Sequence, residues 1–108
     1  MRALVKRGGT ELVSDAAGLR LDPAAHEVST GARTVSLTPT EFRLLAALAA
    51  RPGDTVSRRE LVRAAWPDGA IVHDNTLDVY LARLRRKLRE LSAQAAITTV
   101  HGVGYRLR

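Results

Sequence analysis

The clearest pattern in the chain lies near its C-terminal end, where apolar residues recur with the spacing of a helix. Over residues 74–91 the leucines fall three or four positions apart. At about 100° per residue they lie within about 40° of one direction. These residues are Leu77, Leu81, Leu84, Leu88 and Leu91. The opposite side carries Asn75, Thr76, Val79, Arg83 and Arg86. The stretch therefore predicts a helix with one buried side and one basic, hydrogen-bonding side.

Two shorter helices are predicted before it, each by a capping box. Residues 38–41 read Thr-Pro-Thr-Glu, which offers a hydroxyl N-cap, a proline at the first helical position and a glutamate three residues on. This helix should run to about Ala50 and end at the Pro-Gly of residues 52–53. Residues 57–60, Ser-Arg-Arg-Glu, repeat the box and open a helix that Pro67 ends just after Trp66.

The rest of the chain reads as short strands. Four β-like pieces separated by turn residues predict an antiparallel meander, over residues 11–14, 19–22, 26–30 and 33–37. The first turn is expected over residues 15–18. At the other end, residues 97–100 and 105–108 flank a glycine-containing turn and predict a hairpin. Residues 68–73 are expected to be a loop, with Asp74 as the N-cap of the last helix.

The order sheet, three helices, hairpin predicts an α+β winged helix-turn-helix over residues 11–108. A length of 108 residues suits one domain. The longest apolar run, residues 44–50, is far shorter than the roughly 20 residues that a membrane span needs. The chain has no cysteine, so no disulfide or cysteine-based metal site is available, and no cofactor is expected. A cytoplasmic location and no membrane partner are the expectation.

The charge pattern favours a polyanionic partner. The chain has 17 Lys plus Arg against 11 Asp plus Glu, a formal charge of +6. Five of the seven residues 83–89 are basic, whereas the acidic residues are scattered. The alternative is an ordinary solvated helix face, although such faces usually mix both signs.

A helix with a buried back and a basic front has the shape that enters a DNA major groove. The guanidinium of Arg83 can hydrogen-bond both O6 and N7 of guanine, which makes it the first candidate for reading bases, and Arg86 lies on the same side. Val79, one turn earlier, could meet a thymine methyl group. Asn75 and Thr76, at the helix start, could meet phosphates or base edges.

Catalysis is disfavoured by what the chain lacks. His26, His73 and His101 lie far apart in the sequence without ligand spacing, so no metal site is predicted. The Gly102-x-Gly104 pair is followed by a strand, whereas a phosphate loop needs a helix N-terminus. No nucleophile motif is present.

A protein-interaction module is the competing interpretation. The leucines of residues 77–91 follow a 4-3-4-3 spacing that would also suit a coiled coil. Two heptads are short for such a coil, and a single-domain core needs the stripe, so burial is favoured. Salt-sensitive binding to duplex DNA would separate the two classes.

Four motifs, in order, make the chain resemble one protein family. They are TPTEFRLL at residues 38–45, the Ser57 to Trp66 helix, TLDVYL-x-RLR-x-KL at 76–88 and VHGVGYR at 100–106. This set resembles the OmpR/PhoB family of response-regulator output domains over about residues 11–108. The resemblance implies a winged helix that binds duplex DNA and controls transcription.

The resemblance also implies particular contacts. It suggests phosphate-binding roles for Arg58, Trp66, Asn75, Thr76, Lys87 and Tyr105. Trp66 has a second interpretation, because its position four residues after Val62 also suits a core side chain. The hairpin is expected to be the wing, near the minor groove, with His101 and Arg106. Many relatives have arginine where this chain has His101, so the resemblance does not extend to an arginine inserted in the minor groove.

Partners follow from the same resemblance. A full-length regulator would carry a receiver domain phosphorylated by a histidine kinase, and two copies would occupy tandem half-sites. The isolated domain is expected to be a monomer off DNA. Residues 67–73 correspond to a loop that can touch RNA polymerase in the family, although an ordinary connection of this length needs no function. Residues 1–10 resemble the end of a receiver domain and a linker, and a short first strand is the alternative.

Overall fold

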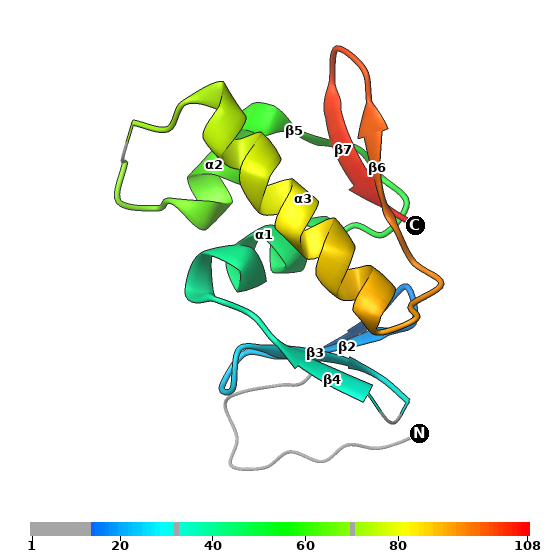
Figure 1. Ribbon diagram of the computed structural model, residues 1–108. Helices are drawn as coiled ribbons and strands as arrows, with labels where there is room; N and C mark the ends of the chain where they lie inside the picture. Colours follow the sequence, from blue (N-terminus) through cyan, green and yellow to red (C-terminus); the bar gives the residue numbers. More distant parts are fainter. Residues whose placement is uncertain (1–13, 32, 70) are drawn as a thin grey trace.

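The computed structural model describes residues 14–31, 33–69 and 71–108, with the side chains of Ser14, Asp15, Ala16 and Asp74 left aside. Three helices lie between two antiparallel sheets in this part of the chain (Figure 1). The helices are α1 (Pro39–Ala49), α2 (Arg58–Ala65) and α3 (Asp74–Glu90). The α+β winged helix-turn-helix predicted from the sequence is confirmed.

The first sheet has four strands in sequence order, each antiparallel to the next. They are β1 (Ser14–Ala16), β2 (Leu19–Asp22), β3 (Glu27–Thr30) and β4 (Arg33–Ser36). The predicted turn over residues 15–18 is wrong, because β1 runs to Ala16. The turn consists of Ala17 and Gly18 alone, both with positive φ (53° and 79°), as a tight two-residue hairpin loop requires. Residues 11–13 of the predicted first strand lie outside the described residues.

The second sheet contains the predicted hairpin and one strand that the sequence did not predict. Its order is β5 (Val56–Ser57), β7 (Gly104–Leu107) and β6 (Ile97–Val100). Gly104 lies opposite Ser57, so closely that a Cβ at this position would collide with the carbonyl oxygen of Val56. Only a glycine permits this approach, which fastens the hairpin to the chain just before α2.

The helix starts follow the capping signals closely. Thr38 caps α1 and Ser57 caps α2, and in each box the glutamate three residues on accepts a hydrogen bond from the backbone N–H of the cap. The prediction that Asp74 caps α3 is wrong. The cap position is His73, whose side chain makes no cap hydrogen bond, while its carbonyl accepts from the N–H of Thr76 at 3.0 Å.

The leucine stripe of α3 forms the centre of the core. Its five leucines are 0–3% exposed and pack with α1, α2 and both sheets. A coiled coil would need this stripe at the surface, so burial removes the basis of that alternative. Arg83 and Arg86, on the other side of the helix, are exposed as predicted. Among the described residues, no helix is long and apolar enough to cross a membrane.

Two groups from the first sheet hold the far end of α3. The hydroxyl of Thr30 donates to the carbonyl of Leu91 at 3.0 Å, and a guanidinium N–H of Arg33 donates to the carbonyl of Glu90 at 2.9 Å. These carbonyl groups belong to the last turn of the helix, where carbonyl oxygens have no N–H partner within the helix. The sheet therefore caps the C-terminal end of α3.

Candidate nucleic-acid interface

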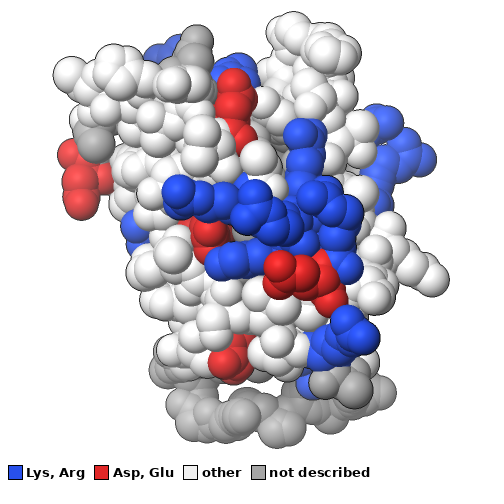
Figure 2. Space-filling model, viewed as in Figure 1, with Lys and Arg blue, Asp and Glu red and all other residues white. Residues whose placement is uncertain are grey.

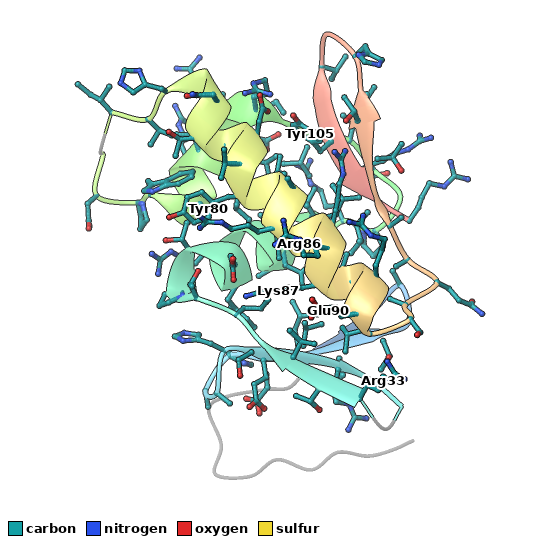
Figure 3. The ribbon with its side chains drawn as sticks, in the orientation of Figure 1. Arg33, Tyr80, Arg86, Lys87, Glu90 and Tyr105 are labelled. Atoms are coloured by element: carbon teal, nitrogen blue, oxygen red, sulfur yellow. The ribbon has the colours of Figure 1, made fainter. Side chains whose placement is uncertain are left out.

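The outward side of α3 is the most basic surface in view. Figure 2 shows Lys and Arg side chains gathered over the middle of this helix. Arg83, Arg86 and Asn75 are exposed and Val79 is 47% exposed, whereas Thr76 is half-buried. Figure 3 shows Arg86 on the side of the helix that faces away from α1. The structure thus brings the three predicted base-reading residues to one open face.

Aromatic rings support the side chain of Arg83, the first candidate for reading bases. The guanidinium of Arg83 lies over the ring of Tyr80, 5.0 Å from its centroid. Tyr80 in turn meets Trp66 edge to face, with 5.4 Å between the ring centroids. Trp66 ends α2, is half-buried and packs against the core. The position of Trp66 is therefore compatible both with a core side chain and with a phosphate-binding residue. Tyr80 lies between Trp66 and Arg83 and supports the arginine.

A closed triangle of hydrogen bonds joins α2, α3 and the hairpin. Arg58 Nη1 donates to Asp78 Oδ1 at 3.0 Å and to the Tyr105 hydroxyl at 3.0 Å. The Tyr105 hydroxyl donates to the same Asp78 oxygen at 2.8 Å. Figure 3 shows Tyr105 between α3 and the hairpin. We call these three residues the outer triangle.

The outer triangle perturbs the ionisation of all its members. The hydrogen bond from Tyr105, followed by that from Arg58, lowers the pKa of Asp78. Burial, followed by the bond to Asp78, raises the pKa of Tyr105. The bond to Asp78 raises the pKa of Arg58. Asp78 is therefore ionised, and Arg58 and Tyr105 are protonated, near neutral pH.

A second arginine ties α3 to the hairpin two turns further along the helix, on nearly the same face as Asp78. Arg85 Nε donates to the carbonyl of Ile97 at 2.9 Å, and its Nη2 donates to the Thr99 hydroxyl at 2.8 Å. Neither Arg85 nor Asp78 was predicted from the sequence. The one available signal for Asp78 was that it is the only acidic residue between Asn75 and Arg89.

Lys87 lies in a different environment from that expected of a phosphate-binding residue. Its ammonium donates to Glu41 Oε1 at 2.7 Å and to the carbonyl of Ser36 at 3.1 Å. The side chain of Glu41 is 2% exposed and that of Lys87 is 28% exposed. Burial alone raises the pKa of Glu41, but the hydrogen bond from Lys87 and that from the Thr38 backbone outweigh it and lower this pKa. We call Glu41 and Lys87 the inner pair.

The two predicted wing residues lie in unlike places. His101 is exposed at the turn of the hairpin, beside Gly102 and Val103. Arg106 is half-buried on β7, opposite Thr98, and its Nε is the one buried side-chain nitrogen left without a hydrogen bond among the described residues. His101 is therefore at the tip of the wing, and Arg106 is at its base.

Two surface hollows flank the N-terminal part of α2. One, of about 480 Å³, lies between α2 and the hairpin and is lined by Ser57, Arg58, Arg59, Tyr105 and residues 99–104. The other, of about 560 Å³, lies beside the loop that precedes α3 and is lined by three arginines of α2 together with Trp66, Val72 and Leu77. In that loop Ile71 is 92% exposed. Within the described residues no cluster of acidic or histidine side chains could hold a metal ion.

Known proteins resemble this chain in both sequence and structure. Residues 32–107 match the family described as "Transcriptional regulatory protein, C terminal". The response regulator MprA of Mycobacterium ulcerans is 41% identical over all of this chain and 50% of its own length. The phosphate regulon transcriptional regulatory protein PhoB of Klebsiella pneumoniae is 38% identical over 89% of this chain and 42% of its own. The chain thus spans about half the length of these relatives.

Solved structures give the same result. The DNA-binding domain of CadC from E. coli superimposes with a TM-score of 0.77 at 26% identity, covering 92% of each chain. The DNA-binding domain of CpxR from E. coli gives 0.72 at 32% identity, covering 92% of this chain and 96% of its own. The DNA-binding domain of the response regulator AdeR, solved in complex with an intercistronic region, gives 0.74 at 28% identity, covering 83% of this chain and 93% of its own. This chain belongs to the family of C-terminal domains of transcriptional regulatory proteins, of the OmpR/PhoB response-regulator type.

Proposed function

We propose that this domain binds duplex DNA sequence-specifically and thereby controls transcription, with α3 in the major groove. The observation that carries the proposal is the division of α3 into a leucine side 0–3% exposed and an open side bearing Arg83, Arg86 and Val79. A helix anchored in this way presents a fixed set of side chains to base edges. The AdeR DNA-binding domain, solved in complex with an intercistronic region, has the same fold.

Base reading is assigned to the open side of α3. Arg83 is the leading residue, because its guanidinium can hydrogen-bond two guanine acceptors and stacking on Tyr80 limits its freedom before binding. Arg86 and Val79 extend the same face along the helix. The exposed methyl groups of Val79 suit contact with a thymine methyl group.

Phosphate binding is assigned to the flanks. Arg58 lines the hollow between α2 and the wing, while Asn75 and Thr76 lie at the start of α3, where backbone N–H groups favour anions. Trp66 is added through its indole N–H. Lys87 is left out of this set because its ammonium already serves Glu41 and Ser36. Tyr105 takes a supporting role, because its hydroxyl hydrogen is donated to Asp78.

The wing would lie along the minor groove with His101 at its tip. Histidine at the tip is attracted to a narrow minor groove less strongly than arginine would be, so we expect the wing to add little affinity. Arg106, half-buried at the wing base, would stay outside the groove.

Partners beyond DNA extend the proposal to the whole regulator. A receiver domain phosphorylated by a histidine kinase would bring two copies to tandem half-sites, and the domain alone would be monomeric off DNA. Residues 67–73, with exposed Ile71, would be available to RNA polymerase. A linker or receiver remnant is proposed for residues 1–10, which lie outside the described residues.

Selection of binders from random duplexes tests the central proposal, followed by quantitative gel shifts on matched and mutated sites. Arg83→Ala should relax sequence preference, costing about 1–3 kcal/mol on the preferred site alone. Arg58→Ala should weaken binding to every sequence alike. With about three cations at the DNA, namely Arg58, Arg83 and Arg86, log K should fall with log salt with a slope of about −3. Equal losses on all sequences for Arg83→Ala would remove it from base reading.

A further inference from the structure

Asp78 is an acidic side chain on the surface that is proposed to meet a polyanion. Its carboxylate is 53% exposed on α3, between the base-reading face and the wing. Near DNA phosphates such a charge is repelled. Electrostatics alone therefore predicts that removing it would strengthen binding.

The hydrogen bonds of the outer triangle give Asp78 a different task. One carboxylate oxygen accepts from both Arg58 and Tyr105, and Arg58 donates to the Tyr105 hydroxyl as well. The three residues come from α2, α3 and β7, so the triangle fixes Arg58 relative to both the groove helix and the wing. The Arg58 guanidinium also lies 5.8 Å from the Tyr105 ring centroid.

We propose that Asp78 is a positioning residue for DNA binding, which holds Arg58 in the orientation that a backbone phosphate requires. The inference rests on the proposed function and adds a residue that acts through another. An arginine side chain loses rotamer freedom when it binds a phosphate, and a side chain already held in place loses less. The guanidinium carries five N–H donors in a planar fork, so one carboxylate and one phosphate can be served together.

Tyr105 completes the arrangement. Its hydroxyl donates to Asp78 and accepts from Arg58, so it joins the two charged groups. Because the phenol has a single hydrogen, it cannot donate to a phosphate while this bond persists. The phosphate donor that the triangle presents is therefore Arg58.

The test is Asp78→Asn, which keeps the shape of the side chain and removes its charge. Positioning predicts that binding becomes weaker by about 5- to 10-fold on specific and non-specific duplexes alike, as lost orientation outweighs lost repulsion. Glu90→Gln is the matched control, since it removes an acidic side chain from the far end of the same helix. It should leave binding unchanged or slightly tighter. Thermal melting of each variant checks that the domain stays folded.

A double-mutant cycle with Arg58→Ala shows whether Asp78 acts through Arg58. In that background Asp78→Asn should no longer weaken binding and should tighten it, because only the repulsion is left to remove. Tighter or unchanged binding of the single variant would overturn the inference, as would an equal loss with and without Arg58. The proposed function fails separately, if the unaltered domain shows no salt-dependent binding to any duplex.

Discussion

The two charged clusters of α3 lie near opposite ends of the helix and in opposite environments. In the inner pair, Glu41 is almost fully buried, and Lys87 joins α3 to the end of β4 and to the start of α1. In the outer triangle, Asp78 and Arg58 are about half exposed beside the wing. Similar chemical groups therefore serve different purposes. A buried charge must keep its partner to avoid a large desolvation cost, whereas an exposed arginine can bind a ligand beside its carboxylate partner.

The largest expected effect comes from breaking the inner pair. Lys87→Ala leaves the buried carboxylate of Glu41 without its cation and should lower the free energy of unfolding by about 3 kcal/mol, measured by urea denaturation. Arg86→Ala, one residue away and exposed, should change it by less than about 0.5 kcal/mol. A folded Lys87→Ala domain of normal stability that loses DNA affinity would instead return Lys87 to the phosphate-binding set.

Acid should act on the inner pair with a definite sign. The pKa of Glu41 is lower in the folded domain than its ordinary value of 4.5. Between the folded and the unfolded pKa, the unfolded chain therefore binds more protons than the folded domain. The stabilisation is complete above about pH 4.5 and is lost as the pH falls through the folded value. Glu41→Gln should flatten this part of the stability profile. An unchanged acid slope in that variant would place the responsible carboxylate elsewhere.

The smallest expected effect is that of salt on the free energy of unfolding. Salt should weaken the interactions of the outer triangle but not those of the inner pair. In low salt, a double-mutant cycle of Asp78→Asn and Arg58→Ala should give a coupling in unfolding free energy of about 0.2–1 kcal/mol. At 1 M salt, where the screening length is about 3 Å, this coupling should approach zero. The cost of Lys87→Ala should persist there, because the inner pair is shielded from ions. Equal salt sensitivity would contradict the contrast in burial.

Much of the fold could be predicted because its signals are local. The capping boxes at Thr38 and Ser57, the leucine spacing of α3 and the glycine turn of the hairpin each depend on residues within one element. The two-residue strand β5 could not be predicted, since it exists through pairing with β7 almost 50 residues later. The positive φ of Ala17 was also missed, because alanine gives no sign of a tight turn.

The site was predicted less completely, because its contacts join residues that are far apart in the sequence. The outward positions of Arg83 and Arg86 follow from helix geometry alone. The outer triangle joins residues separated by 20, 27 and 47 positions, and the inner pair joins residues separated by 46. No periodicity specifies such pairings. Lys87 is an example. Its spacing along α3 places it near the basic face, but the packing of α3 against α1 brings its ammonium to Glu41.

The contact of Gly104 with Val56 divides the hairpin into an anchored strand and a free turn. At Gly104 any larger residue would collide with the carbonyl oxygen of Val56, so the fold restricts this position to glycine. The turn at residues 101–103 is exposed, so substitution of His101 or Val103 leaves this anchor in place. The turn can therefore vary in sequence while the attachment of the hairpin to the strand before α2 stays the same.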